Sequence, residues 1–86
     1  GDIFAVTACI TAKDKKARWI AYRTAIETQP IEALLGILFW KLRTLAVNGA
    51  KGNQYEQLYK AMLGAQKRAW QTGAPLDALV EKIILE

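Results

Sequence analysis

Apolar residues recur at helical spacing through most of the chain, and no stretch alternates apolar and polar residues long enough to indicate a strand. Glycine, proline and capping residues divide this pattern into about five pieces. The predicted helices are 2–10, 15–28, 30–47, 53–72 and a short last helix that starts at Pro75. The sequence therefore predicts an all-α fold, a compact bundle of about five helices in a single domain, 1–86.

Residues that start and stop helices stand at the ends of these segments. Asp2 and Asp14 are suited to cap the first and second helices, because an Asp side chain accepts a hydrogen bond from an unpaired N–H of the first turn. Pro30 suits a first helical turn, where its missing N–H would have no partner anyway. Asn48 followed by Gly49 favours a left-handed stop.

The segment 30–47 carries apolar residues on two sides, although a surface helix normally has one apolar face. At about 100° per residue, its broader sector comprises Ile31, Leu34, Leu35, Leu38, Leu42, Leu45 and Ala46. The smaller sector comprises Ala33, Ile37, Trp40 and Val47, and the residues that separate the two sectors are Glu32, Gly36, Lys41 and Arg43. We expect Leu38, Leu42 and Leu45 to lie in the core.

Two interpretations of the smaller sector stay open. In the first, 30–47 is the central helix, neighbouring helices cover both sectors, and Trp40 fills the bundle. In the second, the smaller sector faces another protein, because aromatic and Arg side chains are favoured anchors at interfaces. The candidate subunit interface then consists of Ala33, Ile37, Trp40, Arg43 and Val47.

The segment 53–72 is amphipathic in the ordinary way, with one apolar and one polar face. Its apolar face comprises Tyr55, Leu58, Tyr59, Met62, Leu63, Ala69 and Trp70. Three aromatic residues on one face could form a base-stacking platform, but Leu58 and Met62 among them favour a core face. We therefore expect this face to pack against the rest of the bundle.

The composition favours a chain outside the membrane and inside a reducing compartment. The longest apolar stretch lies between Glu32 and Lys41, so no run of about 18 uncharged apolar residues exists, and we expect no membrane partner. The single cysteine, Cys9, cannot form an internal disulfide, which favours the cytoplasm. A start at Gly1 without an apolar leader favours an excised or processed domain.

The charge pattern gives little support for nucleic-acid binding. The formal net charge is +4, but the basic residues are spread along the chain and interleaved with acidic ones. The densest basic cluster lies at the start of the second predicted helix, where a solvated helix end is the simpler interpretation. The candidates for weak nucleic-acid contact are Lys13, Lys15, Lys16, Arg18 and Arg23.

Residues that carry catalysis are scarce in this chain. It has no histidine, so acid and base catalysis near neutral pH would need a strongly shifted carboxylate or lysine. Cys9 has no histidine partner and stands among apolar residues, which indicates an inert thiol. No zinc ligand set and no phosphate-binding glycine loop is present. We expect no enzyme activity, no catalytic, metal or cofactor residue, no cofactor and no small-molecule substrate.

Three segments together resemble the C-terminal collar domain of the bacterial DNA polymerase III delta subunit, a clamp-loader subunit. They are "IFAVTACITAKDKKARWIAY", "PIEALLGILFWKLRTL" and "AWQTGAPLDALVEKIIL", which cover nearly the whole chain. In the second segment the residues that match the family pattern are Leu34, Gly36, Leu38, Trp40 and Arg43. The resemblance implies a helical domain that forms a collar with its counterparts in the other loader subunits during DNA replication. It also implies ATPase-like and clamp-binding domains upstream of this chain.

Two main functions therefore stay open, and the remaining possibilities are an unrelated protein-binding bundle and an unrecognised enzyme fragment. The first is a protein–protein assembly domain of a delta-like subunit, whose partners are other clamp-loader subunits and which binds DNA weakly or not at all. The alternative is a small basic helical module that binds nucleic acid through the second helix. A salt-dependent affinity for single strands or duplexes would favour the alternative. An ATPase-like reading frame upstream would favour the first.

Overall fold

The computed structural model describes residues 3–86, which form five α-helices and contain no strand. The helices are α1 (Ile3–Thr11), α2 (Lys15–Thr28), α3 (Ile31–Val47), α4 (Gly52–Thr72) and α5 (Leu76–Leu85). The predicted all-α fold is confirmed, and the predicted helix bounds differ from these by one residue in most cases. The predicted cap Asp2 lies outside the described residues.

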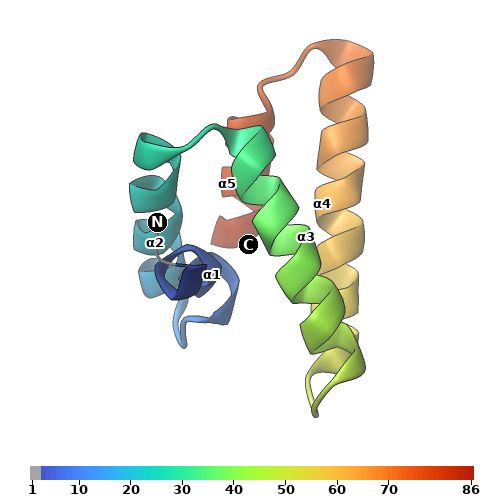
Figure 1. The fold of residues 1–86 in the computed structure, drawn as a ribbon. Coiled ribbons are helices and arrows are strands. Elements are labelled where there is room, and N and C mark those ends of the chain that lie inside the picture. Colours follow the sequence, from blue (N-terminus) through green and yellow to red (C-terminus); the bar gives the residue numbers. More distant parts are fainter. Residues whose placement is uncertain (1–2) are drawn as a thin grey trace.

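The helices pack as a bundle around α3 and α5 (Figure 1). α3 and α4 form a long hairpin, and α1 and α2 form a second pair on the other side of α3. α5 lies behind α3 and contacts both α2 and α4. Helices adjacent in sequence therefore pair locally, and α5 joins the two pairs.

The turns between the helices follow the local chemistry of the sequence. The side chain of Asp14 accepts a hydrogen bond from the N–H of Ala17 at 2.7 Å, so the predicted cap of α2 is confirmed. Gly49 has a left-handed φ of 105° in the turn between α3 and α4. Gly52 starts α4 so close to the carbonyl of Ala46 that a side chain at this position would collide with it. Glycine at these two positions keeps the hairpin tight.

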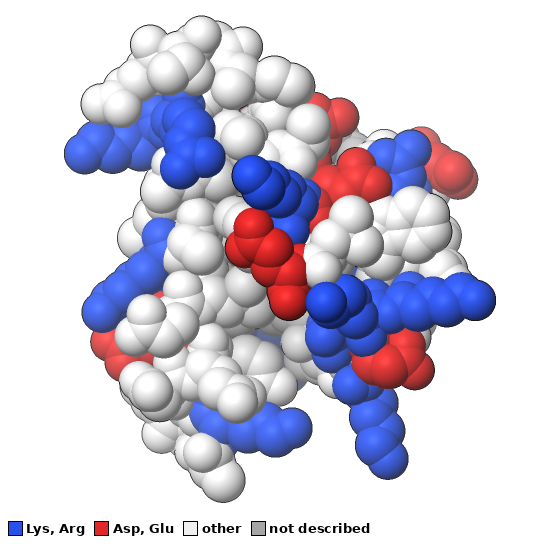
Figure 2. Space-filling view, turned by 180° about the vertical axis from the view of Figure 1, so that it is seen from behind, with Lys and Arg blue, Asp and Glu red and all other residues white. Residues whose placement is uncertain are grey.

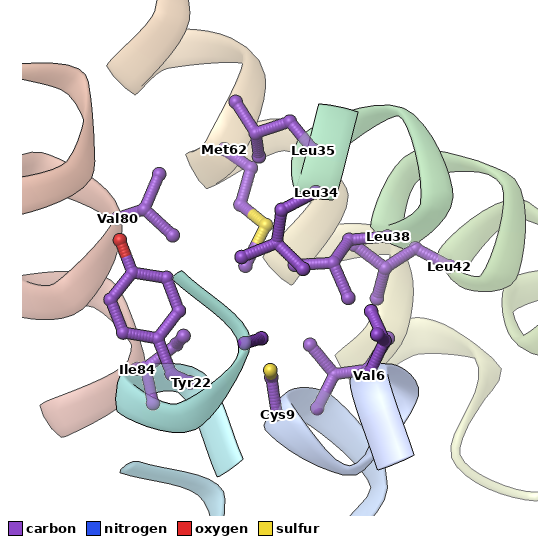
Figure 3. Close-up of a cluster of buried hydrophobic side chains, with 12 residues drawn as sticks. Val6, Cys9, Tyr22, Leu34, Leu35, Leu38, Leu42, Met62, Val80 and Ile84 are labelled. Carbon is purple, nitrogen blue, oxygen red and sulfur yellow. The ribbon is translucent and has the colours of Figure 1, made fainter. Parts of the chain in front are cut away.

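The core lies where all five helices meet (Figure 3). Leu38 and Leu42 are fully buried, as predicted, whereas Leu45 is half-buried at the edge of the same cluster. The other buried apolar residues are Val6, Cys9, Ile10, Tyr22, Ala25, Leu34, Leu35, Met62, Ala65, Val80 and Ile84. The buried Tyr22 hydroxyl donates a hydrogen bond to the carbonyl of Asp77 at 2.6 Å, so this polar atom has a partner inside the fold.

The predicted core face of the fourth helix is only partly correct. Met62 is buried and Tyr59 is half-buried, but Leu63 is 42% exposed and Trp70 is 79% exposed. Trp70 belongs to the last turns of α4, which extend beyond the neighbouring ends of α3 and α5 (Figure 1), whereas Leu63 lines an open hollow beside α3. The overhang therefore explains the exposure of Trp70 alone.

Candidate interaction surface

The smaller apolar sector of α3 faces solvent. Ala33, Trp40, Arg43 and Val47 are exposed, and Trp40 and Val47 keep 49% and 80% of their surface accessible. Ile37 is the exception, because it is half-buried against the core. The interpretation in which neighbouring helices cover both sectors is therefore wrong. α3 packs mainly against α4 and α1, and this leaves one side of it uncovered.

Four of the five candidate interface residues thus share one exposed face, and the half-buried Ile37 lies at its edge. The exposed residues Gly36 and Thr44 lie on the same face at helical spacing. The apolar pattern of the sequence does not indicate these two positions, because neither is a large apolar residue. We use the name α3 outer face for Ala33, Gly36, Trp40, Arg43, Thr44 and Val47.

The α3 outer face combines apolar surface with polar groups that have few internal partners. The hydroxyl of Thr44 donates to the carbonyl of Trp40 at 3.2 Å and so is used within the helix. Within residues 3–86, Arg43 forms no ion pair and the indole N–H of Trp40 forms no hydrogen bond. An aromatic side chain with an available donor, next to an available guanidinium, suits contact with another protein.

The basic candidates do not form one nucleic-acid surface. Lys13, Lys15 and Lys16 are exposed at the turn between α1 and α2. Arg18 donates from Nη1 to the carbonyl of Ala12 at 2.9 Å and to that of Lys13 at 3.3 Å, so it fastens the end of α1. Arg23 faces α5, where its Nη1 lies 3.5 Å from the carboxylate of Glu81.

The charges on the rest of the surface are also dispersed. Figure 2 shows basic side chains dispersed over one side of the molecule, with acidic side chains and uncharged surface between them. A track of phosphates needs several cations along one line. The five candidate cations instead include Arg18, which donates hydrogen bonds at the end of α1, and Arg23, which pairs with Glu81.

Burial raises the pKa of two side chains in the core, Cys9 and Tyr22. Cys9 is 1% exposed, and burial raises the pKa of its thiol to about 11, so the reactive thiolate is rare near neutral pH. Burial, followed by the nearby carboxylates of Asp77 and Glu81, also raises the pKa of the Tyr22 hydroxyl. Among residues 3–86, no group of three or more potential ligands is placed to hold a metal ion. Within the same range no helix has the length and apolarity to cross a membrane.

Comparisons with known proteins do not identify a family. No family model matches the chain, and searches of curated proteins and of solved structures gave no significant match. The resemblance to the delta collar domain therefore stays a prediction that rests on the residues of the three segments. The α3 outer face, in contrast, is a property of the fold and does not depend on that resemblance.

Proposed function

We propose that this chain is a protein–protein assembly domain, and that it belongs to a delta-like subunit of a DNA polymerase III clamp loader. The observation that carries the proposal is the half-exposed Trp40 on a helix whose opposite side is fully buried. The sequence resemblance supplies the identity of the partners, which are other loader subunits in the cytoplasm. In this proposal the domain assembles the complex and catalyses nothing itself.

The energetics of the α3 outer face support a role in assembly. Trp and Arg are the residues most often found at the energetic centre of interfaces, and Trp40 and Arg43 lie one turn apart on this face. Small residues beside them, Ala33 and Gly36, leave room for a partner backbone or side chain to approach Trp40. The half-exposed indole gains burial only when such a partner is present.

The size of a stable interface indicates that α3 does not act alone. Its 17 residues form a rod about 25 Å long and 10 Å wide, whose outward-facing half has a surface of about 400 Å². A standard interface covers about 800 Å² on each partner. The contact with a partner therefore extends from the α3 outer face onto a neighbouring helix.

Reconstitution tests the proposal. The domain is mixed with the purified remaining clamp-loader subunits of the same organism and separated by size-exclusion chromatography. The proposal predicts that the domain elutes with the loader subunits. Separate elution at protein concentrations well above the dissociation constants usual for subunit complexes would overturn it. Sequencing the upstream reading frame gives an independent check, because the proposal predicts an ATPase-like domain there.

The nucleic-acid-binding alternative has no comparable support. Two of its five candidate cations, Arg18 and Arg23, are occupied by contacts within the fold. The three remaining lysines are exposed at one helix end, where solvated charge is the ordinary situation. The proposal therefore includes weak or no direct DNA binding.

A further inference from the structure

We propose that a groove along α4, next to the α3 outer face, receives an amphipathic helix of the partner whose apolar side is flanked by carboxylates. This inference rests on the proposed function, because it specifies what the partner protein presents to this domain. The groove consists of two hollows that meet at Leu63. We call them together the α4 groove.

The first hollow lies between α3 and α4. Its volume is about 590 Å³, and its lining residues are Arg43, Ala46, Val47, Glu56, Tyr59, Lys60 and Leu63. The aromatic ring of Tyr59 packs edge-to-face against Phe39, with ring centroids 5.1 Å apart, so one wall is held in place by the seam between the two helices. Arg43 and Val47 also belong to the α3 outer face, and the two surfaces are therefore continuous.

The second hollow continues from Leu63 along the C-terminal half of α4, and all of its lining residues belong to that helix. Its volume is about 530 Å³, and its lining residues are Leu63, Gln66, Lys67, Trp70 and Gln71. Tyr59, Leu63 and Trp70 lie within about 40° of one another around the helix axis and so form one apolar stripe. From Glu56 to Gln71 the groove runs about 22 Å. A helix of about 15 residues has this length.

The shape and exposure of the α4 groove indicate a helical occupant. Helices dock into apolar grooves through side chains spaced three, four and seven residues apart. The two hollows provide successive places for such side chains, with Leu63 between them. Trp70 is 79% exposed and gains most from being covered.

The charges along the groove indicate an acidic partner. The lining residues include three basic side chains, Arg43, Lys60 and Lys67, and one acidic side chain, Glu56. Three minus one gives a net charge of +2 for the lining, and Glu56 is already paired with Lys60 at 3.6 Å. Within residues 3–86, Arg43 and Lys67 form no ion pair. Carboxylates along the partner helix would complement these two cations.

The same charges argue against a second copy of this chain. Each copy carries a formal net charge of +4, so self-association would bring two positive molecules together. A partner helix flanked by carboxylates is instead attracted by the positive charge of the groove. Electrostatic complementarity mainly determines which partner is selected, and burial of Trp70 and Leu63 supplies the affinity.

The test uses two synthetic peptides of about 15 residues with the same apolar stripe, one flanked by Glu and the other by Lys. Binding to the whole domain is followed by fluorescence anisotropy, and the contact surface is mapped by backbone amide NMR shifts. We expect the Glu-flanked peptide to bind at least about tenfold more tightly. We also expect it to shift the resonances of Leu63 and Trp70 and to weaken with added salt.

Two charge reversals on adjacent residues provide the matched control. Lys67 lines the groove, whereas Arg68 lines a different hollow between α4 and α5. Lys67→Glu should remove most of the preference for the Glu-flanked peptide, and Arg68→Glu should leave it unchanged. Trp70→Ala should weaken both peptides without unfolding the domain, because Trp70 is exposed. Equal binding of the two peptides, or equal effects of the two reversals, would overturn the inference.

Further outcomes separate this inference from the proposed function. If the domain assembles with loader subunits but Lys67→Glu and Trp70→Ala leave that assembly unchanged, the proposed function stands and the groove inference fails. If the Glu-flanked peptide binds the groove but the loader subunits do not bind the domain, the groove inference stands and the proposed function fails. Displacement of the peptide by anionic phospholipid vesicles or by a single-stranded oligonucleotide at lower concentration than by the unlabelled peptide would contradict a protein partner.

Discussion

Trp19 and Glu81 are joined by a hydrogen bond in which the indole Nε1 donates to the carboxylate Oε2 at 2.7 Å, across 62 positions of sequence. The bond connects α2 to α5. The other carboxylate oxygen of Glu81 lies 3.5 Å from Nη1 of Arg23 on the same helix α2. One half-buried carboxylate therefore holds two side chains of α2, and this contact fixes the short last helix against the bundle.

Removing the Glu81 side chain should destabilise the domain more than removing its charged partner. Glu81→Ala leaves the Trp19 indole without its acceptor and should lower the free energy of unfolding by about 1 to 2 kcal/mol. Arg23→Ala should change it by less than about 0.5 kcal/mol, because the ion pair is largely exposed. Urea melts of both variants make the comparison. Equal losses would show that the ion pair, and not the indole bond, fastens α5.

Substitutions of Leu38 and Leu63 compare a core residue with an apolar residue on the surface. Leu38→Ala removes a fully buried side chain and should cost about 2 to 5 kcal/mol of unfolding free energy. Leu63→Ala makes the same chemical change on the half-exposed groove and should cost less than about 1 kcal/mol. The measurement is again a denaturant melt. A loss below about 0.5 kcal/mol for Leu38→Ala would show that the broader apolar sector of α3 does not face the core.

The buried thiol of Cys9 gives the stability a dependence on alkaline pH. In the unfolded chain the thiol loses its proton near pH 9.0, whereas in the folded domain its pKa is raised to about 11. The folded state therefore binds more protons between these values, and its stability falls as the pH rises through this window. Urea melts just below pH 9.0 and near pH 11 should show this loss, and Cys9→Ala should show a smaller one. Equal losses in the two proteins would assign the effect to other groups.

Two helical glycines test whether the glycine on the α3 outer face lowers the stability of the helix but favours assembly. Gly36 and Gly64 both lie inside helices, and a Cβ at either position would meet no other atom within 4 Å. Gly36→Ala and Gly64→Ala should each stabilise the isolated domain by about 0.5 to 1 kcal/mol, because alanine is the better helix former. Only Gly36 lies on the outer face, so only Gly36→Ala should weaken the proposed assembly with loader subunits. Thermal melts and the reconstitution assay measure the two effects. A loss of assembly with Gly64→Ala of the same size would contradict this role of the outer face.

Local chemistry made the helices and the centre of the core predictable. Periodicity and capping residues such as Asp14 determine where helices begin and end, because these effects act within a few residues of the chain. Leu38 and Leu42 belong to the broader of two apolar sectors, and the broader sector of a helix normally faces the core. The sequence was sufficient for these features.

Contacts between distant elements were not predictable in the same way. Both sectors of α3 are apolar, so periodicity alone could not show that Trp40 lies outside the bundle. Trp70 is exposed because α4 extends beyond the ends of its neighbouring helices, and this depends on how the helices pack. The engagement of Arg18 and Arg23 likewise depends on partners that folding brings to them. To predict any of these features, one must know how at least two helices are placed relative to each other.

One measurement decides the role of Trp40, namely the dissociation constant of the proposed complex between this domain and clamp-loader subunits, for the wild type and for Trp40→Ala. Ile20→Ala is the matched control, because Ile20 on α2 is 48% exposed and Trp40 is 49% exposed. We predict that Trp40→Ala weakens the complex by about 2 kcal/mol or more, roughly 30-fold, while Ile20→Ala binds like the wild type and both variants stay folded. A Trp40→Ala domain that is folded and binds with unchanged affinity would contradict the assignment of the α3 outer face as the interface.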